Sequence, residues 1–315
     1  MSTTGGGYRR VAVFGAGGTN IGHHVVKALA SKPDLFTVEI IARKSSKSTF
    51  PTGVTVRYVD DDLPHQQLVE ALTGQDALVS AIGYGAIELE KPLIEAAIEA
   101  KVKRFLPSEY GLNNTNPIAR KLCPVFNAKG EIIEYLKTKE STGLSWTAVP
   151  NGMWLDWTLD PAIAFADINV QTHTAKLWEN GNHKLSFSTL PWAAEGIAQI
   201  LLTPEETANK VVPIHGFEAS QNDLLSALQR LQNVTYQISH FDLKTGVEQA
   251  QTSWVQNKDI QSALWLVKAG FFTAGNGSNF VREGTVQVGN EFLNLPPLDF
   301  NEIVEKAVKQ WAERL

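Results

Sequence analysis

The first half of the chain alternates short β-branched runs with longer stretches whose apolar residues recur with the period of a helix. That alternation is the signature of a parallel sheet covered by helices. It predicts strands at residues 11–15, 36–43, 54–59, 76–83, the start of 103–111, and 144–152, with helices at 21–32, 92–100 and about 127–139. We therefore predict an α/β fold built on a doubly wound parallel sheet.

After Asn151 this rhythm changes. TAKLW (174–178) and LSFST (185–189), with Gly181 between them, predict a β-hairpin. Thr203 before Pro204, and Ser220 with Asp223, have the composition of helix starts. Residues 299–315 predict an amphipathic helix. We found no low-complexity linker, so we expect a smaller α/β domain over 153–315 that packs directly on the domain of 1–152 and is able to return a strand to its sheet.

Composition excludes several classes of protein. The chain has 315 residues, 43% of them hydrophobic, and a net charge of −5 with no basic run, which argues against nucleic-acid binding. No apolar run is long enough to span a membrane, and the N-terminus has no signal-like segment, so we expect a cytoplasmic protein. The single cysteine, Cys123, excludes an internal disulfide. The seven histidines have no metal-ligand spacing, and we predict no metal site.

A glycine-rich turn joins the first predicted strand to the first helix. In GAGGTNIG (15–22), glycines permit a tight turn and let the backbone approach a pyrophosphate at the helix N-terminus. The spacing matches no strict dinucleotide motif, so a glycine turn without a ligand is the alternative. The residues predicted to contact a cofactor here are Gly15, Gly17, Gly18, Thr19, Asn20 and Ile21.

The end of the second predicted strand indicates which dinucleotide binds. An NAD site typically places an acid there to hold the ribose hydroxyls. Here Glu39 lies inside the strand, and Arg43 and Lys47 follow at its end. Cationic donors bind a 2′-phosphate that a carboxylate would repel, so the sequence favours NADP(H). The alternative is that these cations form only a solvated loop.

Three segments carry a family resemblance: VKRFLPSEYG (102–111), FNAKGEIIEYL (126–136) and GLSWT (143–147). With them the chain resembles the NmrA-like and isoflavone-reductase-like branch of atypical short-chain dehydrogenases, particularly fungal members. The resemblance implies a Rossmann-type domain, a smaller C-terminal substrate domain and NADPH-dependent reduction of phenylpropanoid-like aromatic compounds. It departs from the family in a glycine turn one residue longer and in the absence of a glutamine from 83–92.

The same resemblance implies a catalytic role for Lys129, as the acid/base residue of a family that lacks the usual tyrosine. Val125 stands where that tyrosine would be. From its position alone, in the first turn of a helix starting near Asn127, a surface charge is the favoured interpretation of Lys129. Burial and a nearby cofactor would lower its pKa and make it a usable proton donor.

Further site residues follow the predicted strands at the edge where doubly wound sheets bind ligands. We expect cofactor contacts from Ala81, Ile82, Gly83, Ser108, Lys129 and Asn151. A second set is rich in aromatic area and suits a flat apolar substrate, although core packing is the commoner use of such residues. That set is Tyr110, Met153, Trp154 and Trp157.

The sequence therefore predicts an NADPH-dependent reductase of a small aromatic or conjugated carbonyl compound, working as a monomer or homodimer. Two alternatives remain. The first is a non-catalytic NADP(H)-sensing regulator of the kind found among the relatives. The second is an oxidoreductase acting on another substrate class, such as a quinone or an imine.

Overall fold

A seven-stranded sheet organises the structure, a computed structural model that describes residues 7–18, 20–284 and 286–312. All its strands are parallel, in the order β3-β2-β1-β4-β5-β6-β11. Their bounds are β1 Arg10–Phe14, β2 Thr37–Arg43, β3 Thr55–Val59, β4 Ala77–Ser80, β5 Arg104–Leu106, β6 Ser145–Ala148 and β11 Lys210–Val211. The predicted Rossmann-like sheet is confirmed.

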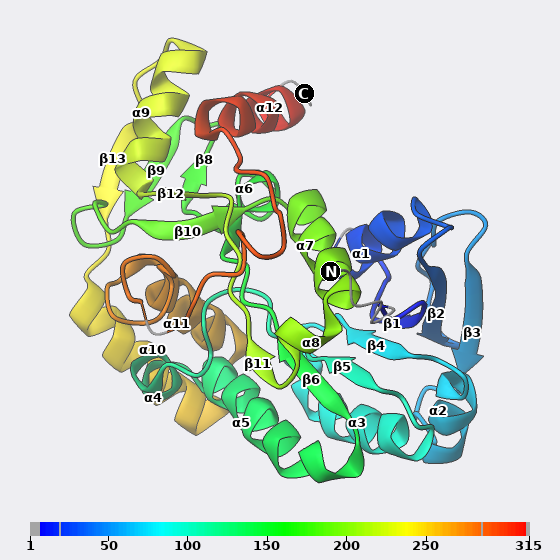
Figure 1. Cartoon of the computed structure of the whole chain (residues 1–315). Helices are drawn as coiled ribbons and strands as arrows, with labels where there is room; N and C mark the ends of the chain where they lie inside the picture. Colours follow the sequence, from blue (N-terminus) through cyan, green and yellow to red (C-terminus); the bar gives the residue numbers. More distant parts are fainter. Residues whose placement is uncertain (1–6, 19, 285, 313–315) are drawn as a thin grey trace.

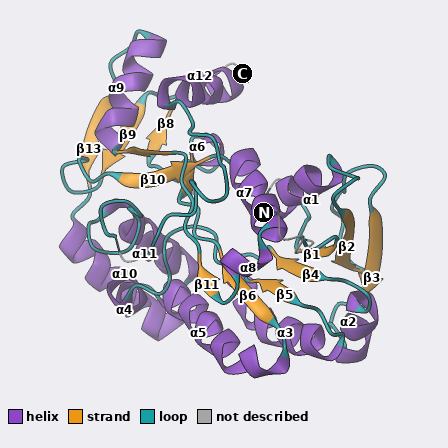
Figure 2. Ribbon diagram, in the orientation of Figure 1, coloured by secondary structure: helices purple, strands orange, loops and turns teal. Residues whose placement is uncertain are grey.

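Helices cover both faces of this sheet, as Figures 1 and 2 show. On one face lie α1 (Ile21–Ala30) and α7 (Leu190–Leu202), and on the other lie α2 (His65–Leu72), α3 (Glu90–Glu99) and α5 (Pro124–Lys139). Side chains of β1 alternate between two apolar cores, Val11 and Val13 toward one and Ala12 and Phe14 toward the other. Burial on both faces explains why these strands are almost continuously apolar.

The later part of the chain adds two small sheets and several helices. One sheet has the order β12-β10-β7 and the other β13-β9-β8. The strands are β7 Met153–Trp154, β8 Ile168–Asn169, β9 Thr174–Leu177, β10 Leu185–Ser188, β12 Phe217–Ala219 and β13 Gln237–His240. The remaining helices are α4 Pro117–Leu122, α6 Leu155–Thr158, α8 Pro204–Thr207, α9 Gln221–Gln232, α10 Leu243–Asn257, α11 Ile260–Phe272 and α12 Phe300–Ala312, with 3-10 turns at Tyr84–Leu89 and Glu140–Thr142.

The predicted hairpin around Gly181 is wrong. The strands on either side of it, β9 and β10, belong to different sheets. β9 pairs with β8 and β13, whereas β10 pairs with β7 and β12. Gly181 does turn the chain, with φ +72°, and its carbonyl accepts a hydrogen bond from the Asn222 amide. The turn signal was therefore correct, but it separates two sheets.

A strand from the later part does return to the main sheet, because β11 pairs in parallel with β6. Arg104 of β5 fixes the connection that leads to it. Arg104 is 1% exposed, and its guanidinium donates to the Thr147 and Thr207 hydroxyls and to the Pro204 carbonyl. These neutral acceptors satisfy a buried cation without a carboxylate. The boundary between 152 and 153 stays a prediction.

The predicted helix starts had mixed outcomes. Ser220 and Asp223 form the expected capping box at the start of α9. Pro204 does begin a helix, but the Thr203 hydroxyl donates to the Gln199 carbonyl instead of capping it. α12 buries an apolar stripe that includes Val304 and Ala307, as its pattern predicts, and the last three residues of the predicted helix lie outside the described residues.

Candidate functional site

A cavity of about 590 Å³ opens at the carboxyl edge of the main sheet. Four groups of residues line it: Asn20 and Ile21 at the start of α1; Ala81, Ile82, Gly83, Ser108 and Tyr110 after β4 and β5; Val125, Phe126 and Lys129 of α5; and Gly152, Met153, Trp154 and Trp157 after β6. Further lining residues include Tyr84, Leu112, Asn114, Phe165 and a face of α11. Most of the predicted site residues therefore meet around one cavity.

The glycine turn packs tightly against the strands behind it. Gly15 has φ +89°, and a Cβ there would lie 2.6 Å from the Ala81 carbonyl oxygen. Gly18 has φ +76° with open space around it. A Cβ on Gly17 would lie 2.3 Å from the Ser48 hydroxyl, so the loop after β2 covers the turn. Side chains are excluded here by backbone conformation or close packing. Thr19, the extra residue of the turn, lies outside the described residues.

The start of α1 has its own polar cap. The Asn20 side chain accepts a hydrogen bond from the His23 amide and donates to the Gly15 carbonyl. Asn20 thereby ties the glycine turn to the helix whose N-terminus would face an anion.

The end of β2 and the loop after it hold the predicted phosphate-binding cations. Arg43 and Lys47 are exposed. Lys44, between them, is held 2.5 Å from Asp60, and Asp61 accepts a hydrogen bond from the Ser45 amide. Acids at the end of β3 thus organise this loop, which sequence reasoning did not anticipate. Arg43 and Lys47 form no ion pair within 4 Å among the described residues.

Lys129 lies in the second turn of α5, because the helix begins at Pro124. The prediction of a first-turn position was wrong: Pro124 takes the first helical position, to which proline is well suited. The Lys129 ammonium donates to the Ser108 carbonyl oxygen at 2.5 Å and to that of Tyr110 at 3.5 Å. Burial lowers the pKa of Lys129. Val125, one turn earlier, lines the same cavity as a small apolar group.

Two buried carboxyl groups lie behind Lys129, and sequence reasoning assigned neither. Glu90 accepts from the Ser80 hydroxyl at 2.7 Å and from the Ser108 amide at 3.1 Å. Glu109 accepts from the Asn114 side chain at 2.8 Å. Burial raises the pKa of each carboxyl to about 7.

Tyr110 and Ser108 direct their hydroxyls into the protein. The Tyr110 hydroxyl donates to the Ser80 carbonyl at 3.0 Å, and burial raises its pKa. The Ser108 hydroxyl donates to the Ile82 carbonyl at 2.7 Å. Tyr110 therefore contributes to the cavity wall while its hydroxyl is engaged elsewhere.

Asn151 is fully buried and is not among the residues that line the cavity. Its side-chain oxygen accepts a hydrogen bond from the Trp154 indole at 3.0 Å. The side-chain nitrogen has no partner among the described residues. In this structure Asn151 thus orients Trp154, and the predicted contact with the cofactor stays untested.

An aromatic series forms one side of the cavity. Trp154 and Trp157 meet edge to face with ring centroids 6.1 Å apart, and Trp157 lies 5.4 Å from Phe165. Phe165 continues the series to Phe271 of α11 at 6.0 Å. These separations are typical of favourable aromatic pairs. The Trp154 ring is only partly buried, so part of its surface is left to a ligand.

A further part of the cavity wall comes from α11, which no sequence motif indicated. Gln261, Leu264, Trp265, Val267, Lys268 and Phe271 line the cavity. Lys268 itself is held 2.7 Å from Asp167. The helical spacing of this stripe was visible in the sequence, but nothing there located it near the sheet edge.

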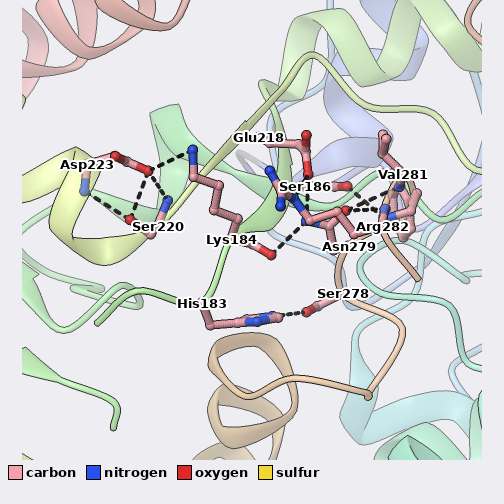
Figure 3. Close-up of polar contacts among 11 residues, drawn as sticks. His183, Lys184, Ser186, Glu218, Ser220, Asp223, Ser278, Asn279, Val281 and Arg282 are labelled. Atoms are coloured by element: carbon pink, nitrogen blue, oxygen red, sulfur yellow. Dashed lines mark hydrogen bonds and ion pairs between the residues drawn. The ribbon is translucent and has the colours of Figure 1, made fainter. Parts of the chain in front are cut away.

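The loop after α11 is held from two sides. Figure 3 shows His183 directed at Ser278, and Asn279 and Arg282 turned toward Glu218. The Asn279 amide and the Arg282 guanidinium lie 2.7 and 2.9 Å from the same Glu218 oxygen. On the other side, the Gly277 carbonyl accepts from the Asn113 amide. This loop therefore links the small sheet containing β10 to the segment that follows Tyr110.

Comparisons with known proteins place this architecture in a family. Residues 8–244 match the NmrA-like family. The chain belongs to the NmrA-like family. It is also 35% identical over 301 residues to "Oxidoreductase aprR" from Aspergillus flavus, covering 95% of this chain and 99% of that protein. Because that similarity spans both chains, we assign this protein to the oxidoreductases of the family. The α11 wall lies beyond the region that the family model matches.

Solved structures agree on the fold of this NmrA-like chain. An isoflavone reductase shares 20% identity at a TM-score of 0.74, covering 96% of this chain and 99% of the other. A complex of leucoanthocyanidin reductase with NADPH from Vitis vinifera also shares 20% identity, at a TM-score of 0.73, covering 95% and 99%. Among the described residues, no helix is long and apolar enough to cross a membrane, and no group of acidic, histidine or cysteine side chains is arranged to hold a metal.

Proposed function

We propose that this oxidoreductase uses NADPH to reduce a small, flat aromatic or conjugated carbonyl compound. The observation that carries the proposal is the shared cavity. Asn20 and Ile21 from the glycine turn line the same space as Lys129 and Trp154, which come from elements more than a hundred residues further along the chain. A dinucleotide on the turn and an acceptor against the aromatic wall would therefore be neighbours.

The residues present fit NADP(H). The glycine turn keeps Gly18 open beside the N-terminus of α1, where backbone amides and the helix dipole favour a pyrophosphate. Exposed Arg43 ends β2 and exposed Lys47 follows it, and the nearby acids are engaged by Lys44 and Ser45. The guanidinium of Arg43 would hold the 2′-phosphate. When bound, NADPH supplies the hydride of the reduction.

The chain's own residues would manage the proton and the position of the acceptor. Lys129 reaches the cavity wall with its ammonium held by two backbone carbonyls, which fixes its position without neutralising it. It is the residue we assign to proton delivery, directly or through water. Val125 is apolar at the position of the family's missing tyrosine, so no hydroxyl at that position shares the task.

The side chains that line the cavity indicate the class of substrate. Tyr110, Met153, Trp154 and Trp157 offer aromatic and thioether surface, with the Tyr110 hydroxyl already engaged. Such a pocket suits a flat neutral ring better than a carboxylate. The names of the similar reductases, which mention an isoflavone and a leucoanthocyanidin, point to the same class of compounds.

Turnover is the decisive test. Purified protein is mixed with NADPH and a panel of phenolic, enone, quinone and imine compounds, and NADPH absorbance is followed. We expect consumption with at least one phenolic or enone compound. Tight NADPH binding by calorimetry without any turnover would instead favour the alternative of an NADP(H)-sensing regulator. Turnover with quinones or imines alone would overturn the proposed substrate class.

The expected monomer or homodimer and the cytoplasmic location belong to the same proposal. Light scattering during size-exclusion chromatography tests the first, and imaging of the tagged protein in its own cell tests the second.

A further inference from the structure

Lys129 faces a small group of charges buried behind the cavity wall. Glu109 follows β5 and is 1% exposed, and Glu90 at the start of α3 is 2% exposed. Neither lies among the residues that line the cavity, whereas Ser108, Tyr110 and Asn114 do. The carboxyl groups are thus shielded from a substrate and can act on it only through their neighbours.

Backbone and side-chain contacts connect these carboxyls to the lysine. Lys129 is held by the carbonyls of Ser108 and Tyr110, which flank Glu109 in the chain. The Ser108 amide donates to Glu90. The charge of Glu109 therefore lies in the same short segment, residues 108–110, whose carbonyls hold the Lys129 ammonium.

Burial and the neighbouring carboxylates have opposite effects on the charge of Lys129. Burial disfavours its ammonium, while the charges of Glu109 and then Glu90 favour it. Arg120 of α4 faces Glu109 from the other side and is paired mainly with Glu134. On α11, which also packs against α5, Lys268 is held by Asp167.

We propose that Glu109 is a positioning residue that keeps Lys129 protonated in neutral and mildly alkaline solution, with Glu90 acting in the same direction. A buried lysine would otherwise lose its proton easily, and a neutral amine cannot deliver one. The importance of this for reduction rests on the proposed function, whereas the protonation of Lys129 can be measured without it.

Glu109→Gln is the informative variant. A glutamine keeps the size of the side chain and an oxygen that accepts from Asn114, but it removes the charge. Glu131→Gln is the matched control, since Glu131 is an exposed residue of α5, the helix that carries Lys129. Melting temperatures and circular dichroism establish that each variant is folded.

The measurement is competitive acetylation of lysines with trace acetic anhydride at pH 6 to 10, with Lys129 followed by peptide mass spectrometry. Only the neutral amine reacts, so the rate reports the pKa of Lys129. Loss of a neighbouring opposite charge shifts a pKa by about 1–3 units. We expect Glu109→Gln to react about tenfold faster than wild type at pH 8 and nearly equally at pH 6, where Glu109 is itself protonated.

Glu90→Gln is expected to shift the Lys129 titration in the same direction by a smaller amount, and it provides the test if Glu109→Gln does not fold. Glu131→Gln should match wild type. Equal Lys129 titrations in wild type, Glu109→Gln and Glu90→Gln would overturn the proposal. Because the readout needs no substrate, a protein that reduces nothing in the panel could still confirm or refute it.

Discussion

At the residue scale, the environment of Lys129 separates it from an ordinary surface lysine. It is partly buried, its ammonium binds two carbonyl oxygens, and it lines the cavity. Its position in the second turn of α5 also removes the unfavourable first-turn interaction with the helix dipole, which falls off within one turn. These features favour a role in proton transfer.

We predict that Lys129→Ala lowers kcat by about 10²–10⁴-fold on a true substrate, because general-acid catalysis contributes a factor of that size. NADPH affinity, measured by calorimetry, should change much less. Lys137→Ala, an exposed lysine of the same helix, is the control. Near-wild-type turnover of Lys129→Ala would return this residue to the status of a structural charge.

We expect a single residue, Arg43, to set the preference for NADPH over NADH. Arg43→Ala should weaken NADPH binding by about 10–100-fold, since one charge-assisted contact to a phosphate is worth roughly 1.5–3 kcal/mol. NADH binding should be almost unaffected. Lys121→Ala is the control, because Lys121 is an exposed cation of α4 that is not among the cavity-lining residues. Equal affinities of the wild-type protein for NADH and NADPH would contradict this assignment.

At the scale of elements, the cavity depends on segments that are distant in sequence. The β7–α6 segment supplies Trp154 and Trp157, and α11 supplies another part of the wall. The loop after α11 is fixed to Glu218 and to the Asn113 amide, so this wall is held from two sides (Figure 3). Substitutions in either part of the wall should therefore weaken substrate binding more than dinucleotide binding.

Trp154→Ala tests this expectation. Loss of one aromatic wall residue should raise KM for an aromatic substrate about 10–100-fold, corresponding to roughly 1.5–3 kcal/mol of buried apolar area. NADPH affinity should stay close to wild type. Trp254→Ala provides a comparison, because that tryptophan of α10 is not among the cavity-lining residues. An unchanged KM in Trp154→Ala would remove Trp154 from the substrate wall.

At the scale of the whole molecule, buried carboxyl groups make stability depend on pH. Burial raises the pKa of Glu90 to about 7 from the ordinary value of 4.5, so the folded protein binds its proton more tightly than the unfolded chain does. Its contribution to the unfolding free energy is therefore fully present below about pH 4.5 and is lost as pH rises through about 7. Burial raises the pKa of Asp156, to about 6, and this acts in the same direction.

Glu90→Gln should therefore gain stability relative to wild type between pH 5 and pH 8, by on the order of 2 kcal/mol. Urea unfolding at both pH values measures the two differences. Subtracting the variant–wild-type difference in unfolding free energy at pH 5 from that at pH 8 cancels any effect of the amide group that does not depend on pH. Glu131→Gln should show no such change, and a constant difference between Glu90→Gln and wild type would refute the assignment.

The sequence by itself determined the main sheet, its glycine turn and the family. The reason is that these features are local: strands buried on both faces need continuous apolar runs, and a tight turn against Ala81 needs glycine at position 15. Likewise, the PSEYG segment and Lys129 are recognisable because their chemistry is carried by neighbours in the chain.

Only the tertiary structure decided the partners of residues that lie far apart. It assigned β9 and β10 to different sheets, because strand pairing depends on edges supplied by β7, β8, β12 and β13. It brought α11 to the cavity from well over a hundred residues beyond β5, and it buried Glu90 and Glu109 behind Lys129. Long-range packing sets burial, and burial sets the charge states on which the proposed chemistry depends.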